Sequence, residues 1–202
     1  PEYTSYNTID FLSAKTGLIA GGSYPPRHDF AAPNWIDPAH AQRRREWPTL
    51  SIVLETRDRG ATWTPTTAPL LGRVTQLRLA RDGWGLSLFN FEYAFEWPSE
   101  VYAIDLTTGK STESFRAKDR LVTDVALFPG KHAFLGAIEP PGRDPQLPIP
   151  GKVKMLESTD LKQWHEMEVD YRAVATRVIL APVDAKHIWA ATNTGMILHL
   201  VP

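Results

Sequence analysis

The chain has 202 residues, 43% of them hydrophobic, which is enough to bury one substantial core. A formal net charge of −1 at pH 7 excludes a general electrostatic argument for nucleic-acid binding. The absence of cysteine excludes disulfide bonds, and no apolar run is long enough to span a membrane as a helix. The chain opens on PEYTSY, with neither an initiator methionine nor a signal-peptide core, which indicates a processed form or a piece of a longer protein.

Helical periodicity is nearly absent, and short β-rich runs alternate with turn residues. Four segments share one pattern, in which a strand and a tight turn precede a second strand rich in Ala, Gly or Leu. These segments are residues 7–23, 74–90, 122–139 and 176–193. Three of them are followed by another hairpin, at residues 49–66, 100–115 and 152–169. A unit of four antiparallel strands that recurs every roughly fifty residues is typical of the blades of a β-propeller.

The sequence therefore predicts an all-β fold, a single β-propeller domain over residues 1–202. Small residues suit its crowded inner strands, namely Gly21, Gly22, Ala137, Ala190 and Ala191. The four expected blades are residues 7–70, 73–117, 121–170 and 175–202. The last blade is one strand short, and residues 1–6 are expected to supply that strand and close the ring. The alternative is that the chain is the C-terminal half of a larger propeller.

The most specific motif follows the apolar run LSIVL. It consists of Thr56, Asp58, Gly60, Thr62 and Trp63 in the pattern Thr-x-Asp-x-Gly-x-Thr-Trp. This pattern resembles the Asp-box, or BNR repeat, of sialidases and of related non-enzymatic propellers such as photosystem assembly factors. Asp58 is expected to accept hydrogen bonds from nearby backbone N–H groups, Gly60 to adopt a conformation that a Cβ opposes, and Trp63 to pack between strands.

A second, shortened copy contains Ser158, Asp160 and Trp164 but lacks the glycine. Residues 105–109, DLTTG, occupy the same place in the second blade without the tryptophan. The resemblance implies that such turns are structural and lie on the face away from a sialidase active site. No carboxylate of these turns is therefore expected to be catalytic.

Long insertions at residues 24–48, 91–99 and 140–151 are all expected on the propeller face opposite these turns. In the first, Asp37 and Pro38 favour the start of a short helix that presents three arginines. Aromatic residues and arginine are enriched at binding hot spots, although the same side chains can simply cover a blade or lie in solvent. The candidate partner-binding residues are Trp35, Arg43, Arg44, Arg45, Trp47, Phe91, Tyr93, Trp97 and Arg143.

No catalytic residue, metal site or cofactor is predicted. His28 and Asp29 have no further ligand at metal-binding spacing. The other candidate ligands, His132, His165, His187 and His199, are scattered along the chain and form no cluster at such spacing. The sequence contains no Gly-rich phosphate loop, no zinc-binding helix motif and no nucleophile elbow.

The sequence thus predicts a non-catalytic propeller that binds a protein partner through one loop-rich face. An assembly-factor role, or an inhibitor or immunity role, is compatible with the resemblance. The alternatives are a carbohydrate-binding propeller and a sialidase-type glycoside hydrolase. Against the hydrolase, the three arginines at 43–45 are contiguous, whereas the resemblance implies a clamp drawn from separate blades, and the Arg-Ile-Pro signature is missing. Neither nucleic acid nor a membrane is an expected partner.

Overall fold

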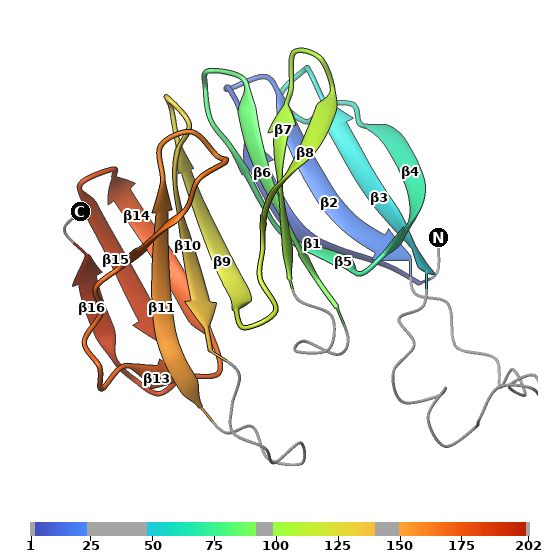
Figure 1. Ribbon diagram of the computed structural model, residues 1–202. Helices are drawn as coiled ribbons and strands as arrows, with labels where there is room; N and C mark the ends of the chain where they lie inside the picture. The colour runs from blue at the N-terminus through green and yellow to red at the C-terminus, as the bar shows by residue number, and fades with distance from the viewer. Residues whose placement is uncertain (1–2, 24–47, 92–98, 140–149, 201–202) are drawn as a thin grey trace, which may run out of the picture.

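The computed structural model describes residues 3–23, 48–91, 99–139 and 150–200. Every regular element in this part of the chain is a β-strand, and the strands form four successive antiparallel sheets. The sheets follow one another like the blades of a fan, with the first and fourth sheets at opposite ends (Figure 1). The predicted all-β, propeller-type fold is therefore confirmed.

Each sheet follows the chain from one strand to its neighbour. The first sheet contains β1 (Thr4–Phe11), β2 (Gly17–Ser23), β3 (Pro48–Thr56) and β4 (Thr64–Leu71). The second sheet contains β5 (Arg73–Leu79), β6 (Trp84–Asn90), β7 (Glu100–Asp105) and β8 (Lys110–Arg116). The third sheet contains β9 (Leu121–Phe128), β10 (His132–Ile138), β11 (Gly151–Ser158) and β12 (His165–Met167), with β13 (Val174–Ala175) paired to β11. The fourth sheet contains β14 (Val178–Asp184), β15 (His187–Thr192) and β16 (Ile197–Leu200).

The prediction that the N-terminal residues complete the fourth sheet is wrong. Thr4 to Tyr6 belong to β1, where Tyr6 pairs with Gly21 and Thr4 with Ser23 of β2. The two strands approach so closely that a Cβ on Gly21 would overlap the carbonyl oxygen of Ser5. Because these backbone groups are already paired in the first sheet, they do not close a ring, and β14, β15 and β16 form a three-stranded sheet.

The first strands of neighbouring sheets are linked by hydrogen bonds between a side chain of one strand and a backbone group of the other. Between the first two sheets, the Asn7 amide donates to the Val74 carbonyl (2.9 Å), and the Leu79 N–H donates to Asp10 Oδ2 (2.7 Å). Between the third and fourth sheets, the Leu180 N–H donates to Asp124 Oδ2 (2.8 Å). These bonds give backbone carbonyl and N–H groups at the sheet boundaries hydrogen-bond partners.

The apolar packing between the sheets is uneven. Twelve buried residues fill the boundary between the third and fourth sheets, among them Phe134 and Met155, each 0% exposed. Eleven fill the boundary between the second and third sheets. Among the described residues, the cluster at the boundary between the first two sheets has four buried members, namely Ala20, Val74, Leu77 and Leu79, with six partly buried hydrophobic residues packed against them. Because protein interiors are close-packed, the sparse boundary is where an open space is expected.

Candidate functional site

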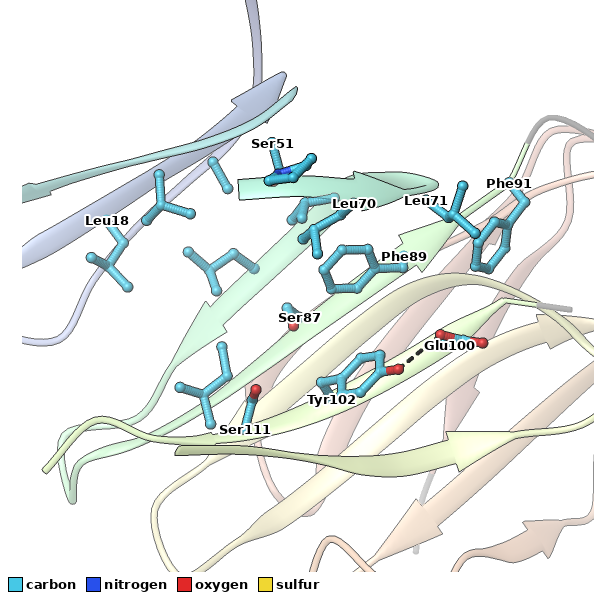
Figure 2. Close-up of a pocket in the computed structure, with 16 residues that line it drawn as sticks. Leu18, Ser51, Leu70, Leu71, Ser87, Phe89, Phe91, Glu100, Tyr102 and Ser111 are labelled. Carbon is cyan, nitrogen blue, oxygen red and sulfur yellow. Dashed lines mark hydrogen bonds between the residues drawn. The ribbon is translucent and has the colours of Figure 1, made fainter. Parts of the chain in front are cut away.

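An apolar groove of about 560 Å³ lies between the first and second sheets. This volume falls within the range of about 300–1,000 Å³ found for ligand pockets. Figure 2 shows side chains from the facing strands converging on it. Its apolar lining comes from β2 to β7 and from the residue after β6, and consists of Leu18, Ala20, Val53, Pro69, Leu70, Leu71, Val74, Leu77, Phe89, Phe91 and Ile104.

Several of the side chains that line the groove are small. Ala20, Ser51, Ser87 and Ser111 line it, and none of them is long enough to reach the opposite wall. At the boundary between the third and fourth sheets, Phe134 and its neighbours close the corresponding space. Small side chains on the facing strands thus contribute to the open space of the groove.

One end of the groove is polar (Figure 2). The Tyr102 hydroxyl donates to Glu100 Oε2 (2.9 Å), and Arg116 Nε lies 3.3 Å from Glu100 Oε1. Burial, followed by the hydrogen bond and the charge of Glu100, raises the pKa of Tyr102 above its usual value of 10. The phenol is therefore a protonated hydrogen-bond donor at neutral pH, and both Glu100 oxygens already have partners.

Phe91 is the one predicted partner-binding residue in the described part of the chain, and it lines the groove. The strands β2, β6 and β10, which precede the three predicted insertions, all end at the same edge of the fan (Figure 1). The other candidates lie outside the described residues, so their roles stay predictions. They are Trp35, Arg43, Arg44, Arg45, Trp47, Tyr93, Trp97 and Arg143.

The turn at residues 56–63 connects β3 to β4 and is held by its own side chains. The Thr62 N–H and hydroxyl donate to the two oxygens of Asp58 (2.9 and 2.6 Å), and the Gly60 N–H donates to Thr56 Oγ1 (2.8 Å). Gly60 has φ +87°, where a Cβ would be strained. Trp63 packs edge-to-face with Phe11 of β1. All acceptors of Asp58 are thus used within the turn, which gives it a structural role.

The turn at residues 158–164 connects β11 to β12 in a shorter form. Asp160 Oδ1 accepts from the Lys162 and Gln163 N–H groups (2.7 and 2.8 Å). Leu161 takes the positive φ (62°) that Arg59 has in the first turn (68°), and no counterpart of Gly60 follows it. Trp164 Nε1 donates to the Ser114 carbonyl of the second sheet (2.9 Å). This turn therefore ties the third sheet to the second.

We expect Asp58 to contribute acid-dependent stability. Hydrogen bonds from the Thr62 hydroxyl, the Thr62 N–H and the Thr56 hydroxyl, in that order, lower its pKa from 3.8 to about 2. Because the folded-state pKa lies below the unfolded-state value, this contribution is present above the unfolded-state pKa and is lost as pH falls toward 2. In urea unfolding, the midpoint difference between wild type and Asp58→Ala is expected to be largest near neutrality and to shrink as pH falls toward 2. A pH-independent difference would contradict this.

Thr62→Val, which removes the strongest donor, should move the Asp58 pKa back toward 3.8.

Within the described ranges, no group of three or more His, Cys, Asp or Glu residues could hold a metal ion. None of the elements in these ranges is an apolar helix of membrane-spanning length. His28 and Asp29 lie outside the described residues.

No protein-family model matches the chain, and no curated protein is similar to it in sequence. The GH74 xyloglucanase of Xanthomonas campestris has a TM-score of 0.55 at 11% identity, over 96% of this chain and 29% of its own. The GH74 enzyme of Niastella koreensis has a TM-score of 0.50 at 14% identity, over 98% of this chain and 29% of its own. A structure of YCF48 bound to a D1 peptide reaches a TM-score of only 0.36 at 13% identity, over 98% of this chain and 79% of its own.

These likenesses establish the class of fold. The two GH74 enzymes are β-propellers, and the present chain has the same type of fold over four sheets. It spans 29% of the length of each of those enzymes, and at 11% and 14% identity their activity does not transfer to it. The assignment of residues 56–63 to the Asp-box repeats stays a prediction.

Proposed function

We propose that this chain is a non-catalytic propeller module that binds a protein partner, and that the groove between the first two sheets holds apolar side chains of that partner. The observation that carries the proposal is a groove of about 560 Å³ with a mainly aliphatic wall. Leu70 and Leu71 extend the apolar surface outward, with 38% and 44% of each exposed. An exposed apolar surface of this kind is typical of a binding site.

The lining favours a protein segment over a sugar. Sugars need many hydrogen bonds, but the described lining residues offer few polar side-chain groups. These are the hydroxyls of Ser51, Ser87, Ser111 and Tyr102 and the carboxylate of Glu100. Aliphatic side chains gain free energy from apolar burial alone, at roughly 25 cal/mol per Å². A peptide segment with two or three aliphatic or aromatic side chains therefore suits this groove best.

The lining does not favour glycoside hydrolysis. Both usual mechanisms need two carboxyl groups, about 5–9.5 Å apart. Among the described residues that line the groove, Glu100 is the one carboxylate, and it is ion-paired to Arg116. The raised pKa of Tyr102 also opposes a phenolate nucleophile. The predicted assembly-factor, inhibitor or immunity roles remain compatible with the binding function that we propose.

Peptide selection tests the proposal directly. Twelve-residue peptides displayed on phage are selected on the purified chain, and we expect the selected sequences to share aliphatic or aromatic residues. Val53→Arg places a charge in the groove and is expected to weaken binding of a selected peptide by about 100-fold, or about 2.7 kcal/mol. Fluorescence anisotropy of the labelled peptide measures this change.

Leu54→Arg is the matched control, because Leu54 is the next residue of β3 and points to the opposite side of the sheet. It is expected to leave peptide affinity within about threefold. Equal losses in the two variants would show that binding does not use the groove. Binding to a glycan array, or turnover of a fluorogenic sialoside, with no peptide selected would support one of the two alternatives instead.

A further inference from the structure

Two buried hydroxyls of the groove have no hydrogen-bond partner among the described residues. Within the described ranges, eight polar residues are buried, and six of them use their side chains in hydrogen bonds. These six are Thr56, Ser99, Ser114, Asp124, Ser158 and Thr192. The other two are Ser51 and Ser87, which are only 8% and 6% exposed. Both of these serines line the groove.

The two serines come from opposite walls of the groove (Figure 2). Ser51 lies on β3 of the first sheet, where it pairs with Ala68 of β4. Ser87 lies on β6 of the second sheet, where it pairs with Leu77 of β5. A molecule that lies in the groove would therefore meet one hydroxyl from each sheet.

A buried hydroxyl without a partner is unfavourable, because it has given up its hydrogen bonds to water. In the free protein, water that enters the groove can bond to Ser51 and Ser87. A bound segment that displaces this water has to replace those hydrogen bonds, or affinity is lost. The two hydroxyls therefore indicate that the bound segment brings polar groups into a groove whose wall is mainly aliphatic.

The main chain of a peptide carries such groups at every residue. Each residue other than proline has one N–H donor and one carbonyl acceptor, and these groups enter the groove together with the apolar side chains. A serine hydroxyl has one donor and two acceptor lone pairs, so it matches either group.

Strand addition at the neighbouring sheet edge is disfavoured as a source of these bonds. β4 is the edge strand of the first sheet, and it borders the groove. Pro65 and Pro69 lie in this strand, where they pair with Leu54 and Leu50 of β3. Proline has no N–H and is tolerated in an edge strand when its nitrogen faces away from the neighbouring strand. The outer edge of β4 therefore lacks two of the donors that a ladder with an added strand would use.

We propose that Ser51 and Ser87 hydrogen-bond to main-chain amide groups of the bound segment and so fix how its apolar side chains enter the groove. This inference rests on the proposed function, because it concerns the same groove. The aliphatic wall favours apolar side chains of any order, whereas the two hydroxyls require amide groups at defined positions between them. The ligand is accordingly an extended apolar peptide segment, and not a small apolar molecule without amide groups.

Serine-to-alanine variants separate this role from a structural one. Ser87→Ala and Ser51→Ala are each expected to weaken binding of a phage-selected peptide by about fivefold in fluorescence anisotropy. Because neither hydroxyl has a partner among the described residues, both variants should keep the wild-type midpoint of urea unfolding. Ser114→Ala is the matched control, since the Ser114 hydroxyl is also buried but donates to the Leu161 carbonyl (2.7 Å). It should lower the midpoint and leave peptide affinity unchanged.

Amide-to-ester changes in the peptide test whether the serines contact its main chain. An ester replaces one N–H with oxygen and weakens the adjoining carbonyl as an acceptor, without changing a side chain. At a contacted position, the ester is expected to weaken binding to the wild type by about fivefold and to have little further effect on one of the alanine variants. Additive losses at every peptide position in both variants would overturn the assignment to the main chain.

The outcomes also separate this inference from the proposed function. If Val53→Arg weakens binding but both alanine variants bind as tightly as the wild type, the groove binds the peptide and the role of the two serines is wrong. If no peptide is selected, or if Val53→Arg binds like the wild type, both proposals are overturned.

Discussion

Asp124→Ala is expected to lower the free energy of unfolding by about 3–5 kcal/mol. The Asp124 side chain is 1% exposed and accepts the N–H groups of Val125 and Leu180, at 2.9 and 2.8 Å. It also lies 3.4 Å from the Arg78 guanidinium of the second sheet. The alanine variant would leave buried N–H groups unpaired at the meeting point of three sheets. Equilibrium unfolding in urea measures the loss.

Asp119→Ala is the matched control for this prediction, because Asp119 is 70% exposed and pairs with Arg120 at the surface. It is expected to lower the free energy of unfolding by less than about 1 kcal/mol. A loss at Asp124 as small as this would show that its hydrogen bonds do not hold the sheets together.

The difference between wild type and Asp124→Ala should also depend on pH. Burial raises the pKa of Asp124 above its ordinary 3.8, against the opposing effects of the Leu180 N–H and Arg78. A raised folded-state pKa means that the stabilising contribution is present below the unfolded-state pKa and is lost as pH rises through the folded-state value. The free-energy difference is therefore expected to be larger in acid than at neutral pH. This dependence is opposite in sign to that of Asp58.

Phe134→Ala is expected to lower the free energy of unfolding by about 3–5 kcal/mol. Phe134 is 0% exposed and lies in the boundary between the third and fourth sheets, where it packs edge-to-face with Phe128. The large loss is expected because Phe134 packs in a cluster with eleven other buried residues, which leave little room for the cavity to collapse. Urea or thermal unfolding measures it.

Phe89→Ala makes the same change at the groove, and it is expected to lower the free energy of unfolding by only about 1 kcal/mol. Phe89 already lines an open space, so its loss creates no new cavity, although it removes the edge-to-face contact with Tyr102. The same variant is expected to weaken binding of a selected peptide. Equal stability losses at Phe89 and Phe134 would indicate that the groove is closed in solution.

The four-sheet architecture was predictable from the sequence because its causes are local. Alternating side chains and turn residues mark each hairpin, and four repeats of the same pattern allow few folds other than a propeller. The turn at residues 56–63 is equally local, since the side chains of Thr56, Asp58 and Thr62 form hydrogen bonds within the turn.

The place of the N-terminal residues was mispredicted because a strand count does not say which edge a strand joins. Tyr6 pairs with Gly21, and the glycine that permits their close approach could have indicated this position. The groove was also missed by the sequence analysis. Its signal is that Ala20 and Ser51 are small and lie on the same side of the first sheet as Leu18 and Val53, which indicates that this side is poorly filled.

By itself, the sequence determined the four-strand repeat, its pattern of strands and turns, and the two tight turns. Each of these features depends on residues near one another in the chain. The tertiary structure alone decided which sheet faces meet and that side chains from two sheets leave a groove open between them. These features depend on the summed volume and polarity of side chains that lie far apart in sequence, and no local pattern contains that sum.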